Sequence, residues 1–157
     1  MAYYDYYKSE IESGDLLAWS STAIELKIVQ LFTLSSFDHV GIAWRIDGRL
    51  FVIEARPPEI RVYPLSKLRP FYHVPMHINW SDEYTEYLLD HVGDSYSRWE
   101  AIRAFFNLSK KDSQWQCAEF ANSFYSRVGL DVDFGLTPRS VVDAAIEHSR
   151  HGIIKVV

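Results

Sequence analysis

Three side chains in this sequence are of the types needed for nucleophilic chemistry at a carbonyl carbon. Cys117 is the single cysteine, so it cannot form an internal disulfide or a cysteine-rich zinc site. A thiol becomes a nucleophile when a neighbouring base takes its proton, and an imidazole steadied by a carboxylate is such a base. His39 and Glu54 supply these two groups. A lone cysteine is more often a small buried apolar residue, so this chemistry requires a fold that brings all three together.

A β-hairpin is predicted between residues 39 and 55. His39 to Ile46 alternates between apolar side chains and small or polar ones, which is the period of a β-strand. Asp47 and Gly48 follow, and this dipeptide is the strongest short hairpin signal. Leu50 to Ala55 then forms the returning strand.

The register of this hairpin decides whether His39 meets Glu54. If the Asp-Gly pair forms a two-residue turn, Ile46 faces Arg49 and Gly41 lies opposite Glu54. His39 and Glu54 are then diagonal neighbours on one face, roughly 7–8 Å apart at the backbone. Gly41 leaves space above the glutamate. A three-residue turn would shift the register and separate the two side chains. The alternative is an exposed ion pair on a solvated face.

The cysteine lies at the beginning of a predicted helix. Apolar spacing predicts a helix from Gln116 to Val128 that ends at Gly129, and Asp112 and Ser113 are candidate N-caps. Cys117 is therefore expected in or near the first turn. The free N–H groups and the positive end of a helix stabilise a thiolate and can hold a developing oxyanion.

Two further polar residues are candidates for binding the substrate or an oxyanion. Gln116 directly precedes the cysteine, and Tyr96 lies in the segment before the predicted helix. For Tyr96, packing in the core is an equally good interpretation.

The remaining pattern predicts an α+β domain, because most strands precede most helices. Pro75 is expected to place its strand at a sheet edge. Thr137 and Pro138 are expected to open the last long helix. The predicted strands are residues 15–19, 39–46, 50–55, 60–63, 71–78 and 153–157, and the predicted helical segments are 3–12, 21–31, 64–68, 84–91, 98–106, 116–128 and 138–148.

Composition indicates a single domain over residues 1–157. The net charge of -5 disfavours nucleic acid as a partner, and no run of about 18 apolar residues predicts a membrane span. The first ten residues lack the basic and apolar regions of a secretory signal, which leaves a cytoplasmic, a virion-associated or a secretion-delivered protein as alternatives. The oligomeric state stays open.

No metal or other cofactor is expected. His73 and His77 share a face if residues 71–78 form one strand, but no third ligand is near them in the sequence. The chain also has no glycine-rich phosphate loop and no GxSxG serine motif.

Short motifs along nearly the whole chain resemble those of the circularly permuted, papain-like NlpC-type cysteine hydrolases, the YiiX/YaeF-like group. The order of histidine, acid and cysteine is the permuted one. The resemblance implies a permuted papain-like fold with an antiparallel sheet packed against a helical layer. The motifs are SGDLLAW (13–19), DHVGIAW (38–44), FVIEA (51–55), IRVYPL (60–65), GDSYSRW (93–99), WQCAEF (115–120) and LTPRSVVDA (136–144).

The resemblance also implies roles for the three residues. Cys117 corresponds to the nucleophile, His39 to the base and Glu54 to the orienting acid. Asp38 and Ala118 stand where serine is common in the family. The implied activity is that of an amidase or peptidase that cleaves an amide bond through an acyl-enzyme, with peptidoglycan peptides as the leading substrate. The alternatives are a thioesterase or acyltransferase on lipid-type acyl groups, and a non-catalytic module of a phage or secretion assembly.

Overall fold

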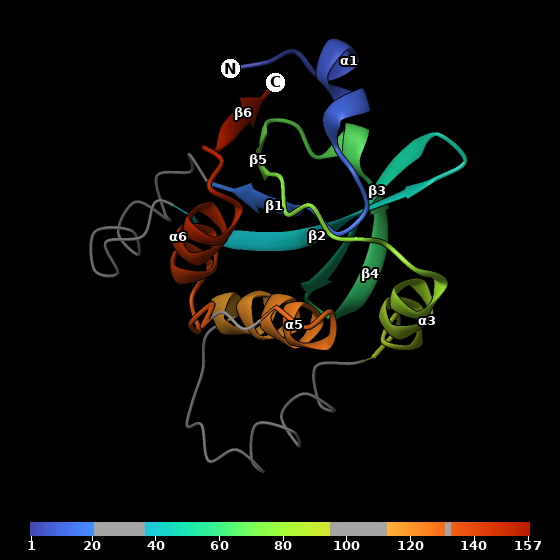
Figure 1. Cartoon of the computed structure of the whole chain (residues 1–157). Helices are drawn as coiled ribbons and strands as arrows, with labels where there is room; N and C mark the ends of the chain where they lie inside the picture. Colours follow the sequence, from blue (N-terminus) through green and yellow to red (C-terminus); the bar gives the residue numbers. More distant parts are fainter. Residues whose placement is uncertain (21–36, 95–112, 131–132) are drawn as a thin grey trace.

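The computed structural model of the chain describes residues 1–20, 37–94, 113–130 and 133–157, with the side chains of 113–116 excepted (Figure 1). An antiparallel sheet of six strands lies at its centre, in the order β4-β3-β2-β1-β5-β6. The predicted α+β class is confirmed. The strands are β1 (Leu16–Trp19), β2 (His39–Ile46), β3 (Arg49–Arg56), β4 (Glu59–Pro64), β5 (Phe71–Val74) and β6 (Ile154–Val156).

Helices of very different length surround the sheet. In the described residues they are α1 (Tyr4–Tyr7), α3 (Asp82–Asp90), α5 (Ser113–Arg127) and α6 (Pro138–Ser149), with the 3₁₀ turns η1 (Lys8–Glu10) and η2 (Leu65–Lys67). Figure 1 shows α5 and α6 on the same side of the sheet, while α1 lies near the chain termini and β6. None of the described helices is both long and apolar enough to cross a membrane.

The two faces of the sheet belong to two apolar clusters. On one face, Val40, Ile42 and Ile53 pack with side chains of α5 and α6, among them Phe120 and Val141. The opposite face forms a second cluster with the N-terminal segment and η2, whose buried members include Tyr4, Ile11, Leu17, Ala43, Val52, Leu65 and Phe71. Strand alternation therefore places both faces of the central strands in the interior, which holds the hairpin rigidly.

The β2–β3 hairpin has the predicted two-residue turn. Asp47 and Gly48 have φ angles of 48° and 73°, and positive φ at both positions is the requirement of a type I′ turn. Ile46 pairs with Arg49, and the strands continue in this register through Ile42 and Ile53. The register on which the sequence argument depended is confirmed.

The last long helix also begins as predicted. Thr137 is the N-cap of α6 and Pro138 is its first residue. The side chain of Thr137 accepts a hydrogen bond from the Ser140 N–H, and the Ser140 hydroxyl accepts one from the Thr137 N–H, which forms a capping box.

One expectation about the sheet is wrong. Pro75 was expected to mark an edge strand, but β5 lies between β1 and β6. The strand ends at Val74, so the missing N–H of Pro75 falls beyond the hydrogen-bonded ladder. The helices expected over residues 21–31 and 98–106 lie outside the described residues.

The close approach of β2 and β3 near the site requires glycine at position 41. A Cβ atom there would lie 2.6 Å from Cγ2 of Val52 and 3.2 Å from Cβ of Glu54. We therefore expect Gly41→Ala to lower the free energy of unfolding by about 1–3 kcal/mol through overpacking, measured by urea denaturation. Gly152→Ala, where an added Cβ meets nothing within 4 Å, is the control. Equal stability of the two variants would contradict this account.

Candidate active site

The side chains of His39 and Glu54 are in direct contact. Nε2 of the imidazole lies 2.6 Å from Oε2 of the carboxylate. Glu54 has no exposed surface and the side chain of His39 is 16% exposed, so water screens this pair weakly. Ile42 pairs with Ile53 at this end of the β2–β3 ladder, and a Cβ added at Gly41 would lie 3.2 Å from Cβ of Glu54, so His39 is the diagonal neighbour of the glutamate. The contact predicted from the sequence is present.

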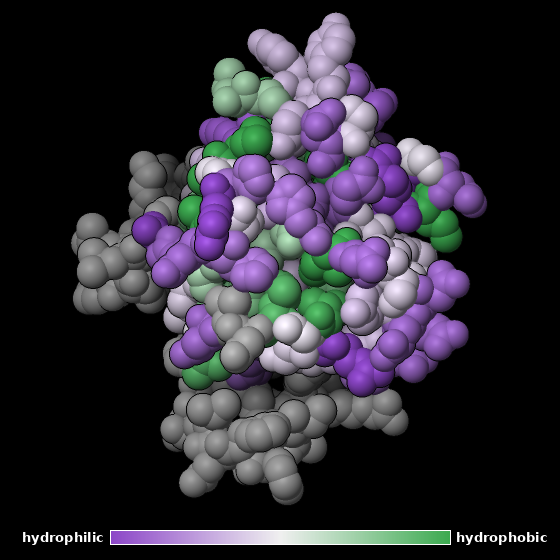
Figure 2. Space-filling view, in the orientation of Figure 1, coloured by the Kyte–Doolittle hydropathy of each residue, from purple (hydrophilic) through white to green (hydrophobic). Residues whose placement is uncertain are grey.

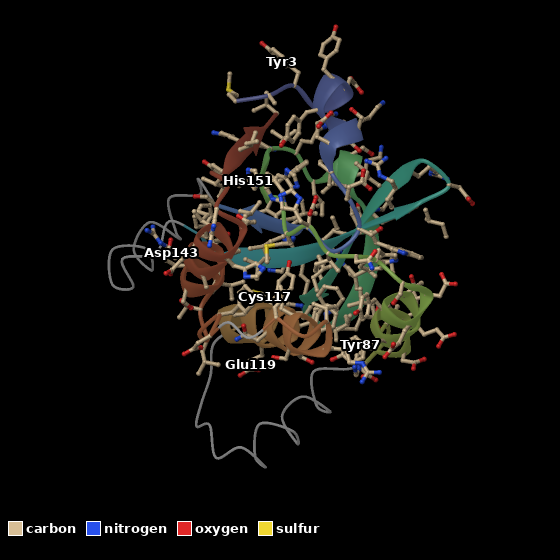
Figure 3. All side chains as sticks on the ribbon, viewed as in Figure 1. Tyr3, Tyr87, Cys117, Glu119, Asp143 and His151 are labelled. Atoms are coloured by element: carbon tan, nitrogen blue, oxygen red, sulfur yellow. The ribbon has the colours of Figure 1, made fainter. Side chains whose placement is uncertain are left out.

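Cys117 provides the third group. It lies on α5 with 1% of its surface exposed, and its side chain is hydrogen-bonded to His39. Since Nε2 of the imidazole faces Glu54, Nδ1 is the ring nitrogen left for the thiol. Figure 3 shows the sulfur of Cys117 on the side of α5 that faces the sheet. The structure therefore brings Cys117, His39 and Glu54 into one hydrogen-bonded chain.

The position of Cys117 in its helix differs slightly from the expected one. The helix begins at Ser113, so the cysteine is its fifth residue and starts the second turn. In a regular α-helix its N–H therefore points at the carbonyl of Ser113. The unpaired N–H groups of the helix start belong to the preceding turn. Gln116 lies in that turn with its side chain outside the described residues, and Tyr96 lies outside them altogether.

Arg61 is a member of the site that the sequence reasoning missed. It lies directly opposite Glu54 on β4. Its Nε and Nη2 atoms donate to Oε1 of the carboxylate at 2.8 and 2.6 Å. A two-residue turn between Arg56 and Glu59 places Arg61 across from Glu54, so the register of the second hairpin was the signal that could have found it.

Trp19 was also missed. It pairs with His39 across β1 and β2, and the centroids of the two rings are 5.5 Å apart. The indole Nε1 donates to the carbonyl of Leu68 at 2.7 Å, which fixes the plane of the indole. The imidazole therefore lies against a ring that cannot easily rotate.

Opposing effects set the protonation of these groups. Burial alone would lower the pKa of His39, but its hydrogen bonds to Cys117 and Glu54 and the charges of both groups raise that pKa to about 9. Burial alone would raise the pKa of Glu54, but the hydrogen bonds and charges of His39 and Arg61 hold that pKa below its ordinary value. The site favours a charged imidazolium beside a charged carboxylate at neutral pH.

A second histidine–carboxylate pair, His73 with Asp15, belongs to a hydrogen-bond network that holds the fold together. His73 is fully buried, and its Nε2 lies 2.8 Å from Oδ2 of Asp15 while its Nδ1 is hydrogen-bonded to the Tyr7 hydroxyl at 3.0 Å. Asp15 also accepts from the N–H groups of Glu12 and Met76, each at 2.8 Å. This network ties the N-terminal segment to β5.

The condition under which His73 and His77 would share a strand face is not met, because β5 ends at Val74. The ring of His77 instead lies 4.8 Å from that of His151. Among the described residues, no group of three or more histidine, cysteine or acidic side chains is arranged to hold a metal ion.

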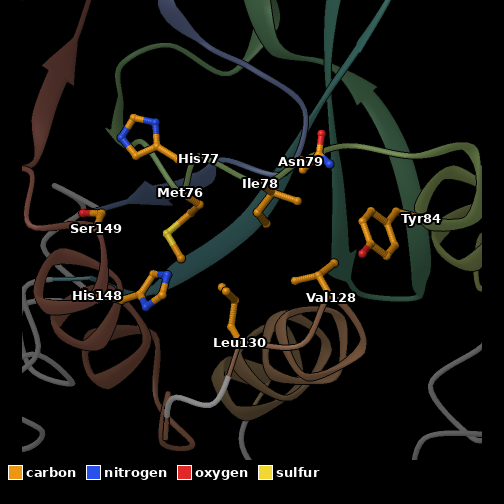
Figure 4. Close-up of a pocket in the computed structure, with 9 residues that line it drawn as sticks. All are labelled: Met76, His77, Ile78, Asn79, Tyr84, Val128, Leu130, His148 and Ser149. Atoms are coloured by element: carbon orange, nitrogen blue, oxygen red, sulfur yellow. The ribbon is translucent and has the colours of Figure 1, made fainter.

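A pocket of about 390 Å³ lies elsewhere, between the chain that follows β5 and the ends of α5 and α6 (Figure 4). Its lining includes Met76, Ile78, Val128, Leu130 and His148. Val128 is 11 residues beyond Cys117, which corresponds to about 16 Å along a helix. Figure 2 shows hydrophobic residues gathered in the middle of this face of the molecule. The pocket is therefore separate from the Cys117 site.

Together these observations define an α+β protein with a buried Cys-His-Glu site. The fold is similar to that of the crystal structure titled metalloprotein YiiX from Escherichia coli O157:H7, with a TM-score of 0.54 and 20% sequence identity. The match covers 75% of this chain and 66% of that one, slightly less than two thirds of its length. No protein-family model matches the sequence. No curated protein matches it either.

The titration of His39 tests the electrostatics of the site. We expect its ring protons to titrate in an NMR experiment with a midpoint near 9, against about 6.5 for an ordinary histidine, because the proton is held between two anionic partners. The signal is identified by its loss in His39→Gln. A midpoint near 6.5 would contradict the described contacts.

The same shift makes stability depend on pH. Because the folded-state pKa of His39 lies above the unfolded one, its contribution is complete below about pH 6.5 and is lost as the pH rises towards 9. The contribution is on the order of 3 kcal/mol. We expect the difference in unfolding free energy between wild type and His39→Gln to shrink from pH 6 to pH 9.5 in urea denaturation. A difference that stays constant over this range would refute the linkage.

Proposed function

We propose that this chain is a cysteine hydrolase that cleaves an amide bond through an acyl-enzyme on Cys117. The observation that carries the proposal is the hydrogen-bonded chain in which His39 contacts Cys117 and, through Nε2, Glu54. A cysteine beside a histidine that is oriented by a carboxylate is the arrangement that activates a thiol.

The first half of the reaction uses the proton held on His39. The proton of the thiol has already passed to His39 in this ion pair, and the thiolate of Cys117 attacks the carbonyl carbon of the substrate. When the C–N bond breaks, the imidazolium gives its proton to the departing amine and a thioester remains on the enzyme. Glu54 stabilises the imidazolium and holds Nε2, so that the other ring nitrogen stays directed at sulfur.

The second half reverses the proton transfer. A water molecule gives a proton to His39 while its oxygen attacks the thioester carbon, and the C–S bond breaks. The products are a carboxylic acid and the restored thiol. If an amine or alcohol takes the place of water, the same site transfers the acyl group, so hydrolase and acyltransferase differ only in the acceptor.

The order of the site residues along the chain supports a permuted papain-like arrangement. The histidine strand β2 and the acid on β3 precede the helix α5 that carries the cysteine. The fold shared with YiiX is consistent with this proposal, and the motif resemblance indicates peptidoglycan peptides as the substrate class. YiiX is titled a metalloprotein; that description belongs to YiiX, and the steps proposed for this chain use side chains alone.

The reactivity of Cys117 tests the activation of the thiol without a substrate. Because the hydrogen-bonded imidazolium of His39 stabilises a thiolate, we expect the rate of iodoacetamide modification of Cys117 to rise at lower pH in wild type than in His39→Ala. The rates are measured by mass spectrometry, and each is divided by the rate of the same variant at pH 9.5. This removes differences in the access of the reagent to Cys117, which is 1% exposed. Identical profiles for the two proteins would sink the enzyme proposal.

A substrate panel identifies the bond. Purified muropeptides, acyl-lipids and ubiquitin-like conjugates are offered to wild type and to Cys117→Ala. We expect wild type to cleave muropeptides and Cys117→Ala to be inactive. Glu54→Gln should slow the reaction about 10²–10⁴-fold, because the amide removes the charge that stabilises the imidazolium.

Other outcomes of this panel are equally informative. Cysteine-dependent turnover of acyl-lipids alone would replace the amidase by a thioesterase or acyltransferase. An inert Cys117 together with no turnover would favour a non-catalytic module on the same fold.

A further inference from the structure

We propose that Arg61 is a positioning residue of this site, which fixes Glu54 as a charged carboxylate with Oε2 turned towards His39. This inference rests on the proposed function, because it assigns Arg61 a role in the same hydrogen-bonded chain. It goes beyond the Cys-His-Glu triad by adding a fourth ionic member to it.

The two oxygens of Glu54 have separate partners. Oε1 accepts from both Nε and Nη2 of Arg61, and Oε2 faces Nε2 of His39. The carboxylate plane is therefore fixed on both sides. Rotation of the side chain would break at least one charge-assisted hydrogen bond, and such bonds are about twice as strong as neutral ones.

Burial gives Arg61 a part, beside His39, in keeping the charge on Glu54. The glutamate has no exposed surface, and an ionised carboxylate that loses its solvation without compensation becomes protonated instead. His39 supplies one compensating cation, but it must give up its proton during each reaction cycle. Arg61 stays protonated throughout, so the carboxylate keeps a cationic partner when the imidazole is neutral.

Arg61 is itself held in place. Its guanidinium carbon lies 4.6 Å from the centroid of the Tyr63 ring, which is two residues further along β4 on the same face. The side chain is 33% exposed, so it lies at the border between the buried carboxylate and solvent. A planar guanidinium can stack on the ring and, at the same time, donate hydrogen bonds to the carboxylate. The ammonium of a lysine cannot reproduce both contacts.

An ordinary structural ion pair would have different consequences. Removal of such a pair lowers stability and takes a positive charge away from the surroundings of His39, which by itself raises the proton affinity of the imidazole. A positioning role instead couples Arg61 to the proton affinity of the imidazole, because a Glu54 that has become neutral no longer stabilises the imidazolium.

The decisive experiment compares Arg61→Gln with Arg49→Gln. Arg49 is exposed, lies at the turn end of β3 five residues before Glu54 and loses the same charge, so it is the matched control. In Arg61→Gln we expect the NMR titration midpoint of His39 to fall by at least about one pH unit, a tenfold loss in proton affinity. Arg49→Gln should keep the wild-type midpoint, and the midpoint of Arg61→Lys should fall between the two. A midpoint in Arg61→Gln that equals or exceeds that of Arg49→Gln would overturn the inference.

A wild-type measurement covers the case in which Arg61→Gln does not fold. The Nε–H of Arg61, bonded to a buried carboxylate, should exchange slowly with solvent, and its NMR signal should shift as His39 titrates. Rapid exchange, or a signal that does not respond to the titration, would overturn the inference.

The two proposals can fail separately. Failure of the cysteine hydrolase proposal shows as a pH profile of Cys117 alkylation that is the same in wild type and His39→Ala. Failure of the Arg61 proposal shows in the His39 titration, which requires neither a substrate nor a reactive thiol.

Discussion

The burial of an ionised carboxylate is the constraint on which the rest of the site depends. Glu54 has no exposed surface, and the cost of removing a carboxylate from water is several kcal/mol unless charged hydrogen bonds compensate it. His39 and Arg61 provide that compensation, one at each oxygen. The imidazolium in turn is stable in a buried position only because the carboxylate is next to it. Each charge is therefore the condition for the other.

This mutual dependence explains why the local sequence is so restricted. Gly41 stands where a side chain would collide with Val52 and crowd Glu54. The Asp47-Gly48 turn sets a register in which His39 and Glu54 share a face. A shift of one residue would send the carboxylate into the apolar cluster around α5 without a cation. The hairpin thus fixes a chemical pair as well as a fold.

The hairpin part of the site could be predicted from the sequence. The contact between Cys117 and His39 and the place of Arg61 in the site could not. Alternation and turn chemistry are local signals, so the His39–Glu54 contact could be worked out from residue spacing alone. The contact between Cys117 and His39 joins elements more than 70 residues apart, and only the packing of α5 on the sheet creates it. Arg61 was missed because the pairing of β3 with β4 was not worked out.

At Pro75 the sequence led to a wrong prediction rather than to a missed contact. The absence of an N–H on proline was correctly taken to disfavour a central strand, but the strand simply stops one residue earlier. Sequence reasoning identified the right constraint there and applied it to the wrong strand length. Boundaries of this kind are decided by which residues find partners in the sheet, and β6 comes from the far end of the chain.

The sheet contains a second histidine–carboxylate pair, and the comparison shows what distinguishes a candidate site from a structural network. Asp15 lies 2.8 Å from His73 and Glu54 lies 2.6 Å from His39, and both carboxylates are buried. The Nδ1 atom of His73 is hydrogen-bonded to the hydroxyl of Tyr7. Burial and the charge of Asp15 raise the pKa of Tyr7, so that hydroxyl stays protonated. The corresponding nitrogen of His39 is left for a thiol. A carboxylate–imidazole pair alone therefore does not indicate chemistry; the group at the second ring nitrogen decides it.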